Sequence, residues 1–416
     1  MKDNLKFIDL FAGCGGLSLG MEKAGFTPVY VNEINKDALS TYLMNRREEF
    51  PYLDDPKFHS RNIKECMDDK FFTTLKRNLK KQHGSSEVDL LCGGPPCQGF
   101  SGIGIRRSYS VDKKHLPSNH LFEDMARFVH KMQPKIFLFE NVQGLMNAKW
   151  EKGGEKGEIF KQVLATFKSL KGYTVKYKLV HSKDYGVPQN RPRILIIGIK
   201  SKLVEDNNSS EDALENEFLP DPMMSDPYPN LEEIFSDLVD PKFEYGGETT
   251  TYPKDPETKW QEEFRTKNGK VLGKGESLTE QEYSNHSLRT REKFQAMIDD
   301  ENGEIPEEFK TKKFAQRRLR RTWNNKGPSI TITSLPDDFV HYEQARTPTV
   351  RECARAQTFP DWYQFAGKRT TGGIRRAGNP RENIFEREVP KYTQIGNAVP
   401  VKLAEEIGKH FIQLLK

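Results

Sequence analysis

The chain has 416 residues, of which 35% are hydrophobic, so it has room for two domains and a sizeable core. No apolar run approaches the length of a membrane span and the first residues lack the apolar segment of a signal peptide, so we expect neither membrane insertion nor export. The net charge of +5 is small for this length and by itself indicates no class of partner.

The first predicted elements form a nucleotide-type site. Residues 7–11 read as a strand, residues 12–16 as a glycine loop, and residues 17–24 as the start of a helix. Glycines allow a ligand close to the backbone, and a helix N-terminus offers free N–H groups. A second strand, residues 28–32, ends at Glu33, where an acid in such a fold meets a ribose diol. A tight turn is the alternative, but the acid favours a bound nucleoside cofactor.

A cysteine on a rigid turn follows the next strands. Residues 57–63 predict a short third strand, residues 64–82 a charged helix with a solvated face, and residues 88–91 a buried strand. Two glycines and two prolines then fix the turn that carries Cys97. An inert thiol is the alternative to a thiol placed to attack a ligand. The five cysteines lack metal-ligand spacing, which favours reduced thiols in a cytosolic protein and no metal site.

The segment after this turn is basic and broken by glycines. Residues 102–118 carry Arg106 and Arg107 and form either a disordered surface loop or a mobile lid that touches phosphates. An amphipathic helix is predicted over residues 121–131. The apolar strand 136–139 then ends at Glu140, whose carboxyl group should be partly desolvated and therefore suited to donate or share a proton. The alternative role for this carboxylate is a structural helix cap.

Paired arginines precede the last strand of the first half. A helix over residues 160–170 is followed by strands at 175–180 and 194–199. Just before the second of these strands, Arg191 and Arg193 flank a proline. Arginine is favoured where paired donors grip a planar polar group, so we expect these two to bind a ligand. A salt bridge to a nearby acid is the alternative.

The composition of the chain changes after residue 200. Residues 201–310 are polar and rich in prolines, which indicates a second domain of loops and short strands. Residues 311–321 hold a basic cluster without an acid, typical of a nucleic-acid footprint or of a solvated helix face. A helix is predicted over residues 350–358. The final helix has one apolar face that should dock on the first domain.

The order of motifs resembles the DNA (cytosine-5)-methyltransferase family of the restriction-modification type, which uses S-adenosylmethionine. The resemblance rests on residues 7–16, 94–101, 140–142, 189–193, 351–360 and 394–400. It implies a Rossmann-like α/β methyltransferase domain with a mixed, mostly parallel sheet and a smaller, irregular target-recognition domain. We expect residues 1–200 and 391–416 to form the catalytic domain, and residues 201–390 the recognition domain with its return connection.

The resemblance also implies the residues of the sites. The expected cofactor pocket comprises Phe11, Ala12, Gly13, Gly15, Gly16, Leu17, Glu33, Ile34, Asn62, Ile63, Gly94, Pro96, Leu121, Asn397 and Ala398. One departure is Asn62, which stands where the family usually has an acid that accepts the adenine amino group; its amide oxygen can still accept that bond. The expected DNA contacts are Gln98, Ser101, Arg106, Arg107, Gln189, Arg317, Arg318, Arg320 and Arg321.

The chemistry explains why the family needs these groups. Addition of the Cys97 thiolate to carbon 6 of cytosine makes carbon 5 nucleophilic. Glu140 would protonate or hydrogen-bond ring N3, and Arg193, beside Arg191, would grip O2. Carbon 6 is hidden in a stacked duplex, so the base must be flipped out. The product of the cofactor would be S-adenosylhomocysteine.

The expected partner is double-stranded DNA, and the expected location is the bacterial cytoplasm, at the nucleoid. A monomer is expected, and the restriction-modification type allows a companion endonuclease that acts on the same site without a stable complex. Two alternatives remain at this point. One is a transfer-RNA methyltransferase, which the large second domain disfavours. The other is a catalytically silent DNA-binding relative, which Cys97, Glu140 and Arg193 disfavour.

Overall fold

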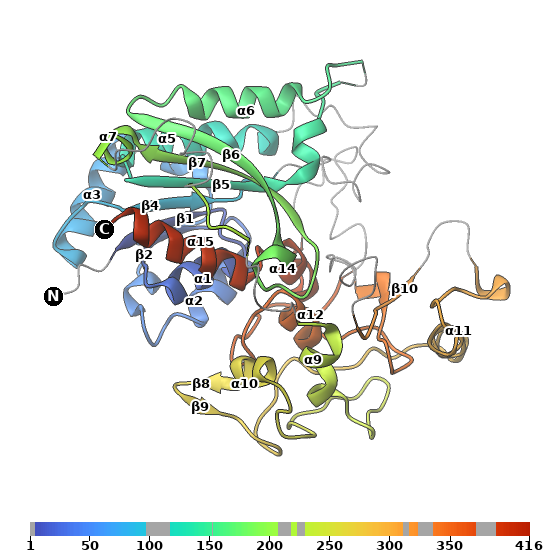
Figure 1. The fold of residues 1–416 in the computed structure, drawn as a ribbon. Coiled ribbons are helices and arrows are strands. Elements are labelled where there is room, and N and C mark those ends of the chain that lie inside the picture. The colour runs from blue at the N-terminus through green and yellow to red at the C-terminus, as the bar shows by residue number, and fades with distance from the viewer. Residues whose placement is uncertain are drawn as a thin grey trace.

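The computed structural model describes residues 5–96, 117–151, 153–206, 218–222, 229–310, 316–322, 336–371 and 388–416 (Figure 1). Within this part of the chain, no helix is both long and apolar enough to cross a membrane. The ribbon shows a layered lobe that contains a twisted sheet, and beside it a lobe of short elements joined by long loops.

The layered lobe is built on a seven-stranded sheet in the order β3-β2-β1-β4-β5-β7-β6. The strands are β1 (Lys6–Leu10), β2 (Thr27–Asn32), β3 (His59–Ser60), β4 (Leu90–Gly93), β5 (Ile136–Val142), β6 (Tyr173–His181) and β7 (Pro192–Lys200). The first five in this order are parallel, and β7 runs antiparallel to both β5 and β6. This confirms the predicted mixed, mostly parallel sheet of a Rossmann-like fold.

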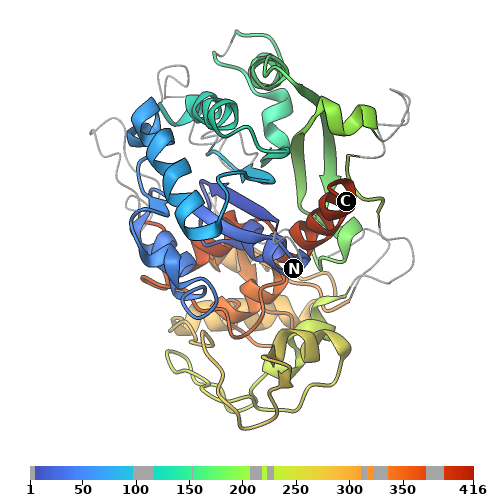
Figure 2. The same cartoon turned by 90° about the vertical axis from the view of Figure 1, so that its left-hand side faces the viewer.

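Alternate residues of the strands bury two apolar layers. On β5, Phe137 and Phe139 face one cluster and Ile136 and Leu138 face the other. The first cluster is covered by α3 (Asp69–His83), α5 (Leu121–Met132) and α6 (Glu158–Lys168). The second is covered by α1 (Gly16–Ala24) and α15 (Val401–Leu414) (Figures 1 and 2). Helix α2 (Lys36–Met44) lies beside α1 on the same side of the sheet, where the hydroxyl groups of Tyr42 and Ser18 are hydrogen-bonded at 2.9 Å (Figure 1).

The final helix returns to the first part of the chain, as expected. A methyl group on Gly20 of α1 would lie 2.4 Å from Cβ of Ala404 on α15. On the other helix, a methyl group on Gly408 would lie 2.7 Å from Cβ of Ala24. Glycine therefore allows the axes of α1 and α15 to approach closely.

The predicted third strand is too long. Pairing with β2 is limited to His59 and Ser60, and a short 3-10 turn, η2 (Ile63–Cys66), begins directly after Asn62. The Asn62 side chain accepts a hydrogen bond from the backbone N–H of Lys64, so it caps this turn and ends the strand. The predicted helix over 64–82 is in fact η2 followed by α3, and α3 has an exposed charged face and a face that buries Phe72 and Leu75.

The second lobe has few regular elements. It contains α9 (Leu231–Phe235), α10 (Lys259–Arg265), β8 (Thr266–Lys267), β9 (Lys270–Val271), α11 (Leu288–Asp299), β10 (Arg317–Arg318), β11 (Phe339–Val340) and α12 (Val350–Ala356). Among the described residues, the remaining helices are α7 (Ser201–Asp206) and α14 (Lys391–Asn397), and the other short 3-10 turns are η1 (Pro51–Asp54), η3 (Pro117–His120), η4 (Gln143–Asn147), η5 (Ser182–Tyr185), η6 (Ser236–Leu238), η7 (Glu307–Phe309) and η8 (Pro336–Asp338). The irregular second part is thus confirmed, and the helix at 391–397 was not predicted.

Candidate active site

The predicted site residues lie at the carboxyl edge of the parallel strands. In the sheet, β1 lies between β2, which follows it in the chain, and β4, so the strand order runs in opposite directions on the two sides of β1. This reversal makes a crevice between the loops after β1 and β4, where open α/β sheets bind ligands. The loop after β5 lies next to it, since Gly93 at the end of β4 pairs with Phe139 of β5.

Glu33 joins the glycine loop to the end of β2. Its two carboxylate oxygens accept hydrogen bonds from the N–H of Gly13 at 2.8 Å and of Asn35 at 2.7 Å. Burial raises the pKa of Glu33, and these backbone hydrogen bonds oppose the rise. Each oxygen keeps a lone pair, so the group can still accept bonds from a diol.

The three glycines of the loop have different neighbours. A side chain on Gly13 would meet no atom within 4 Å, so this residue faces open space. A methyl group on Gly15 would lie 2.8 Å from Nη1 of Arg46, and one on Gly16 would lie 2.5 Å from the carbonyl oxygen of Val399. Leu17 is buried in the core. Space for a ligand therefore accounts for the glycine at position 13 only. At positions 15 and 16 a side chain would collide with other parts of the protein.

The residues expected around adenine differ in exposure. Ile34 is 64% exposed, which is unusual for a large apolar side chain and suits a surface that a flat apolar group covers. Ile63 is only 4% exposed and packs in the core. The amide of Asn62 donates to Glu65 at 3.3 Å, and its oxygen accepts from Lys64 N–H.

The other expected pocket residues lie at the rim of the same edge. Phe11 has a positive φ of 59° and is partly buried. Pro96 and Asn397 are exposed, and Leu121 and Ala398 are half-buried. With Glu33, Gly13 and Ile34, this set supplies acceptors, backbone donors and an apolar face, which fits a nucleoside cofactor.

Glu140 lies inside β5, which extends past it to Val142 because β7 continues the ladder. Glu140 is 9% exposed, so it is largely desolvated as expected, and its Oε1 lies 2.6 Å from Nε of Arg193 on the antiparallel neighbour. The register pairs Glu140 with Leu195 and Val142 with Arg193, so the ion pair is a diagonal contact on one face of the sheet.

The loop that leads to Cys97 is held against β5. A methyl group on Gly94 would lie 2.8 Å from Oε2 of Glu140, so only glycine lets this backbone approach the carboxylate. The amide of Asn141 donates to the carbonyl oxygen of Pro95 at 3.0 Å. Cys97 itself lies outside the described residues.

Two further predicted site residues turn inward. Arg191 is buried and donates to the carbonyl oxygen of Gly396, and burial lowers the pKa of its guanidinium, with the positive charge of Arg193 as a second cause. Gln189 is 1% exposed, and its amide donates to the carbonyl oxygen of Ala356 at 2.6 Å and to the side-chain oxygen of Gln357 at 3.0 Å. A contact between Gln189 and DNA stays a prediction that this inward position does not favour.

Gln357 is a residue whose role the sequence did not reveal. It is buried, and its amide group donates to the carbonyl oxygens of Ile395 and Ala398 while its oxygen accepts from Gln189. It therefore holds the loop of the paired arginines to the end of α14. The only signal in the sequence was its place within the motif at residues 351–360.

The arginines of the basic cluster have different surroundings. Arg318 donates to the carbonyl oxygens of Ile298 and Glu301, both at 2.7 Å, and so caps the end of α11. Arg321 pairs with Glu232 and Glu343. Arg317 and Arg320 are exposed. The other expected DNA contacts, at Gln98, Ser101, Arg106 and Arg107, lie outside the described residues.

Comparisons with known proteins agree with this geometry. The family profile described as C-5 cytosine-specific DNA methylase matches residues 5–413. The chain is 33% identical to type II methyltransferase M.DdeI of Desulfomicrobium norvegicum, over 97% of this chain and 88% of that protein. It is 31% identical to type II methyltransferase M1.HphI of Haemophilus parahaemolyticus, over 99% and 87%.

A solved structure shares the fold. The crystal structure described as a DNA modification methyltransferase encoded within a prophage (E. coli) aligns with a TM-score of 0.67 at 24% identity, over 99% of each chain. The family match and the two type II relatives cover nearly the whole chain. The chain therefore belongs to the C-5 cytosine-specific DNA methylase family and is a DNA cytosine-5 methyltransferase of the restriction-modification type.

Proposed function

We propose that this enzyme transfers a methyl group from S-adenosylmethionine to carbon 5 of a flipped-out cytosine in a short, specific duplex sequence, through a bond between Cys97 and carbon 6. The observation that supports this most directly is the Glu140–Arg193 ion pair of 2.6 Å, held against Gly94 three positions before Cys97. At the edge of the sheet where the parallel strands end, the carboxyl group of Glu140 suits N3 of a cytosine and the guanidinium of Arg193 suits its O2.

The described cysteines do not compete for the nucleophilic role. Cys14, Cys66, Cys92 and Cys353 are all buried. Burial raises the pKa of all four thiols, that of Cys14 to about 12. Since the thiolate is the reactive form, such thiols are inert, which favours Cys97 on its glycine-proline turn.

The residues would act in a definite order. The Cys97 thiolate forms a bond to carbon 6, while Glu140 gives a proton to N3 and Arg193 donates to O2. The electron pair of the 5,6 double bond is thereby shifted toward carbon 5. S-adenosylmethionine, when bound at Glu33, Ile34 and the loop of Gly13, supplies an electrophilic methyl group. A base would then remove the carbon-5 proton, and the electrons of that bond would restore the 5,6 double bond as the sulfur leaves carbon 6 as a thiolate. N3 would return its proton to Glu140.

Duplex DNA is the proposed substrate, read by the second lobe and by the segment after Cys97. We place the catalytic domain at residues 1–200 and 391–416, supported by the sheet and by α15, and the recognition domain at 201–390. We also propose that the enzyme acts as a monomer in the bacterial cytoplasm, beside any companion endonuclease.

The test is to trap the covalent bond. The protein is incubated with S-adenosylmethionine and duplexes from a library that carries 5-fluorocytosine, and adducts are mapped by mass spectrometry. We expect an adduct at Cys97 that Cys97→Ser abolishes and the control Cys66→Ser retains. Methylation that leaves no adduct at Cys97 would contradict the assigned nucleophile. Labelling of transfer RNA instead of DNA would contradict the substrate.

A further inference from the structure

Two successive carbonyl groups of the glycine loop are bound by side chains from distant parts of the chain. The hydroxyl of Tyr363 donates to the carbonyl oxygen of Cys14 at 2.5 Å. Nη2 of Arg46 donates to the carbonyl oxygen of Gly15 at 3.2 Å, and Nη1 of the same arginine donates to the hydroxyl of Tyr363 at 3.0 Å. Arg46 and Tyr363 therefore form one clamp on the loop.

The clamp is rigid because its members are buried and fully engaged. Tyr363 is completely buried and Arg46 nearly so. Nε of Arg46 lies 2.6 Å from Oε1 of Glu22, and its guanidinium stacks 3.8 Å from the centre of the Tyr42 ring. Gly15 has a φ of 85°, and a methyl group there would lie 2.9 Å from the Tyr363 hydroxyl. The loop and the clamp thus exclude any larger residue at position 15.

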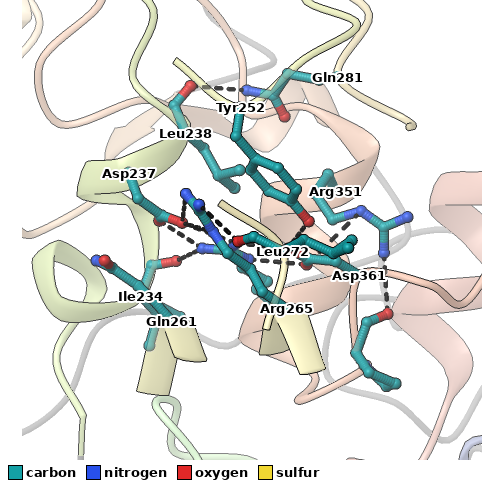
Figure 3. Close-up of polar contacts among 12 residues, drawn as sticks. Ile234, Asp237, Leu238, Tyr252, Gln261, Arg265, Leu272, Gln281, Arg351 and Asp361 are labelled. Atoms are coloured by element: carbon teal, nitrogen blue, oxygen red, sulfur yellow. Dashed lines mark hydrogen bonds and ion pairs between the residues drawn. The ribbon is translucent and has the colours of Figure 1, made fainter. Parts of the chain in front are cut away.

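Tyr363 belongs to the second lobe, where buried charges fix its backbone. Nη2 of Arg351 on α12 donates to the carbonyl oxygen of Tyr363 at 3.0 Å. Two residues earlier, Asp361 accepts hydrogen bonds from Arg355 and Tyr252. Figure 3 shows Asp361 and Arg351 within the polar network that also includes Asp237 and Arg265. Contacts thus run from that network to the loop after β1.

We propose that Tyr363 is a positioning residue for S-adenosylmethionine, which sets the shape of the cofactor loop from the second lobe. The turn that it holds closes between Gly15 N–H and the carbonyl oxygen of Ala12 at 2.9 Å, and it contains Gly13, whose N–H binds Glu33. Without the clamp, the N–H of Gly13 would no longer be held in place for Glu33, the residue that we propose binds the ribose of the cofactor. This inference rests on the proposed function of the loop as the cofactor site.

The variant Tyr363→Phe removes the hydroxyl and keeps the ring. We expect the Kd for S-adenosylmethionine, measured by calorimetry on the full chain, to rise about tenfold, as for the loss of one buried hydrogen bond. The KM for the cofactor should rise by a similar factor, whereas kcat at saturating cofactor and the KM for DNA should stay within about twofold, because Glu140 and Arg193 are untouched. Hydrogen exchange of residues 11–17 without cofactor should become faster.

Two tyrosines of the same apolar cluster provide matched controls. Tyr392→Phe removes a buried hydrogen bond of the same kind, from the hydroxyl to the carbonyl oxygen of Pro348 at 2.8 Å. Tyr342→Phe removes a buried hydroxyl that has no hydrogen-bond partner among the described residues. Both controls should bind the cofactor as the unchanged protein does.

The outcomes separate the inference from the proposed function. Equal cofactor affinity in Tyr363→Phe and the unchanged protein overturns the inference, and so does equal weakening in Tyr392→Phe. If Tyr363→Phe does not fold, Arg46→Lys tests the same clamp and should show the same selective rise in Kd; normal affinity in that variant also overturns it. An unchanged protein that binds no S-adenosylmethionine contradicts the proposed function instead.

Discussion

The two lobes bury their interiors by different means. In the sheet lobe the inner strand β5 begins with four apolar residues, Ile136, Phe137, Leu138 and Phe139, which are all fully buried. In the second lobe the largest fully buried side chains include four arginines: Arg265, Arg346, Arg351 and Arg355. The sheet lobe therefore depends mainly on apolar area and packing. The second lobe has apolar clusters as well, but it also buries charges, and each of these arginines needs a partner inside the protein.

The short helix α12 shows how closely these charges are matched. Arg351, Glu352 and Arg355 lie within its seven residues and are fully buried. Burial alone would raise the pKa of Glu352, but Arg346 and His341 outweigh it, and the pKa is about 2. Arg355 bridges Asp237 and Asp361. This part of the chain needs few strands because its side chains bind one another and the backbone carbonyls directly.

The largest effect on stability should follow the loss of Arg355. Arg355→Leu leaves Asp237 and Asp361 short of a partner inside the protein, which should lower the free energy of unfolding by about 3–5 kcal/mol. The matched change in the sheet lobe, Ile196→Val, should cost only about 1 kcal/mol. Urea unfolding of both variants checks the contrast. Equal costs would show that the charges are not what holds the second lobe.

The next prediction concerns the buried carboxyl of Asp9 on β1, to which no arginine of the described residues is hydrogen-bonded. Burial raises the pKa of Asp9 from 3.8 to about 7, although a hydrogen bond from Ser18 opposes the rise. The folded protein therefore holds a proton that the unfolded chain releases, so the stability falls as the pH rises from 3.8 toward 7 and is level above that.

Asp9→Asn removes this cost. At pH 8 the variant should be more stable than the unchanged protein by up to about 4 kcal/mol, and the gain should shrink as the pH falls below 7. The same change in the second lobe, Asp237→Asn, should instead destabilise, because Arg265 and Arg355 lose a charged partner. Unfolding curves between pH 5 and 8 measure both. A gain for Asp9→Asn that does not depend on pH would contradict the argument.

A smaller effect should come from added volume in the sheet lobe. A methyl group on Gly198 of β7 would lie 2.0 Å from the ring of Phe137, which packs against Phe167 and Tyr173. Gly198→Ala should therefore cost about 1–3 kcal/mol through overpacking. Gly153→Ala, where a methyl group meets no atom within 4 Å, is the control and should change little. Thermal unfolding measures the difference, and equal melting temperatures would contradict it.

The sequence allowed the sheet lobe to be predicted more fully than the second lobe. Apolar runs identified the seven strands in outline, because period and burial are local properties, and they placed Glu33 directly after a strand. The end of the apolar strand was set too early, because β5 continues past Glu140 to Val142 along its antiparallel neighbour. The length of the third strand was wrong because the Asn62 cap competes with pairing.

The inward contacts could not be predicted because they join distant residues. Tyr363 and Cys14 are 349 positions apart, and a tyrosine in the sequence does not reveal which carbonyl it binds. Likewise, the sequence predicted a shared role for the arginines of the basic cluster, as a nucleic-acid footprint or a solvated helix face. In the structure, Arg318 binds the carbonyl oxygen of Ile298 and Arg321 pairs with Glu232. The identity of a charged residue fixes its need for a partner but not which partner it finds.

The smallest effect should come from this basic cluster, and it tests whether neighbouring arginines have separate roles. Arg318→Ala removes two bonds to the carbonyl end of α11 and should cost about 1 kcal/mol of stability, with little change in DNA affinity. Arg317→Ala should leave stability unchanged, weaken DNA binding and reduce the slope of log affinity against log salt by about 1, as for one phosphate contact. Fluorescence anisotropy over a salt series and thermal unfolding separate the two variants. If Arg318→Ala were the one to lose DNA affinity, the second lobe would be using the same arginine for its own packing and for its substrate.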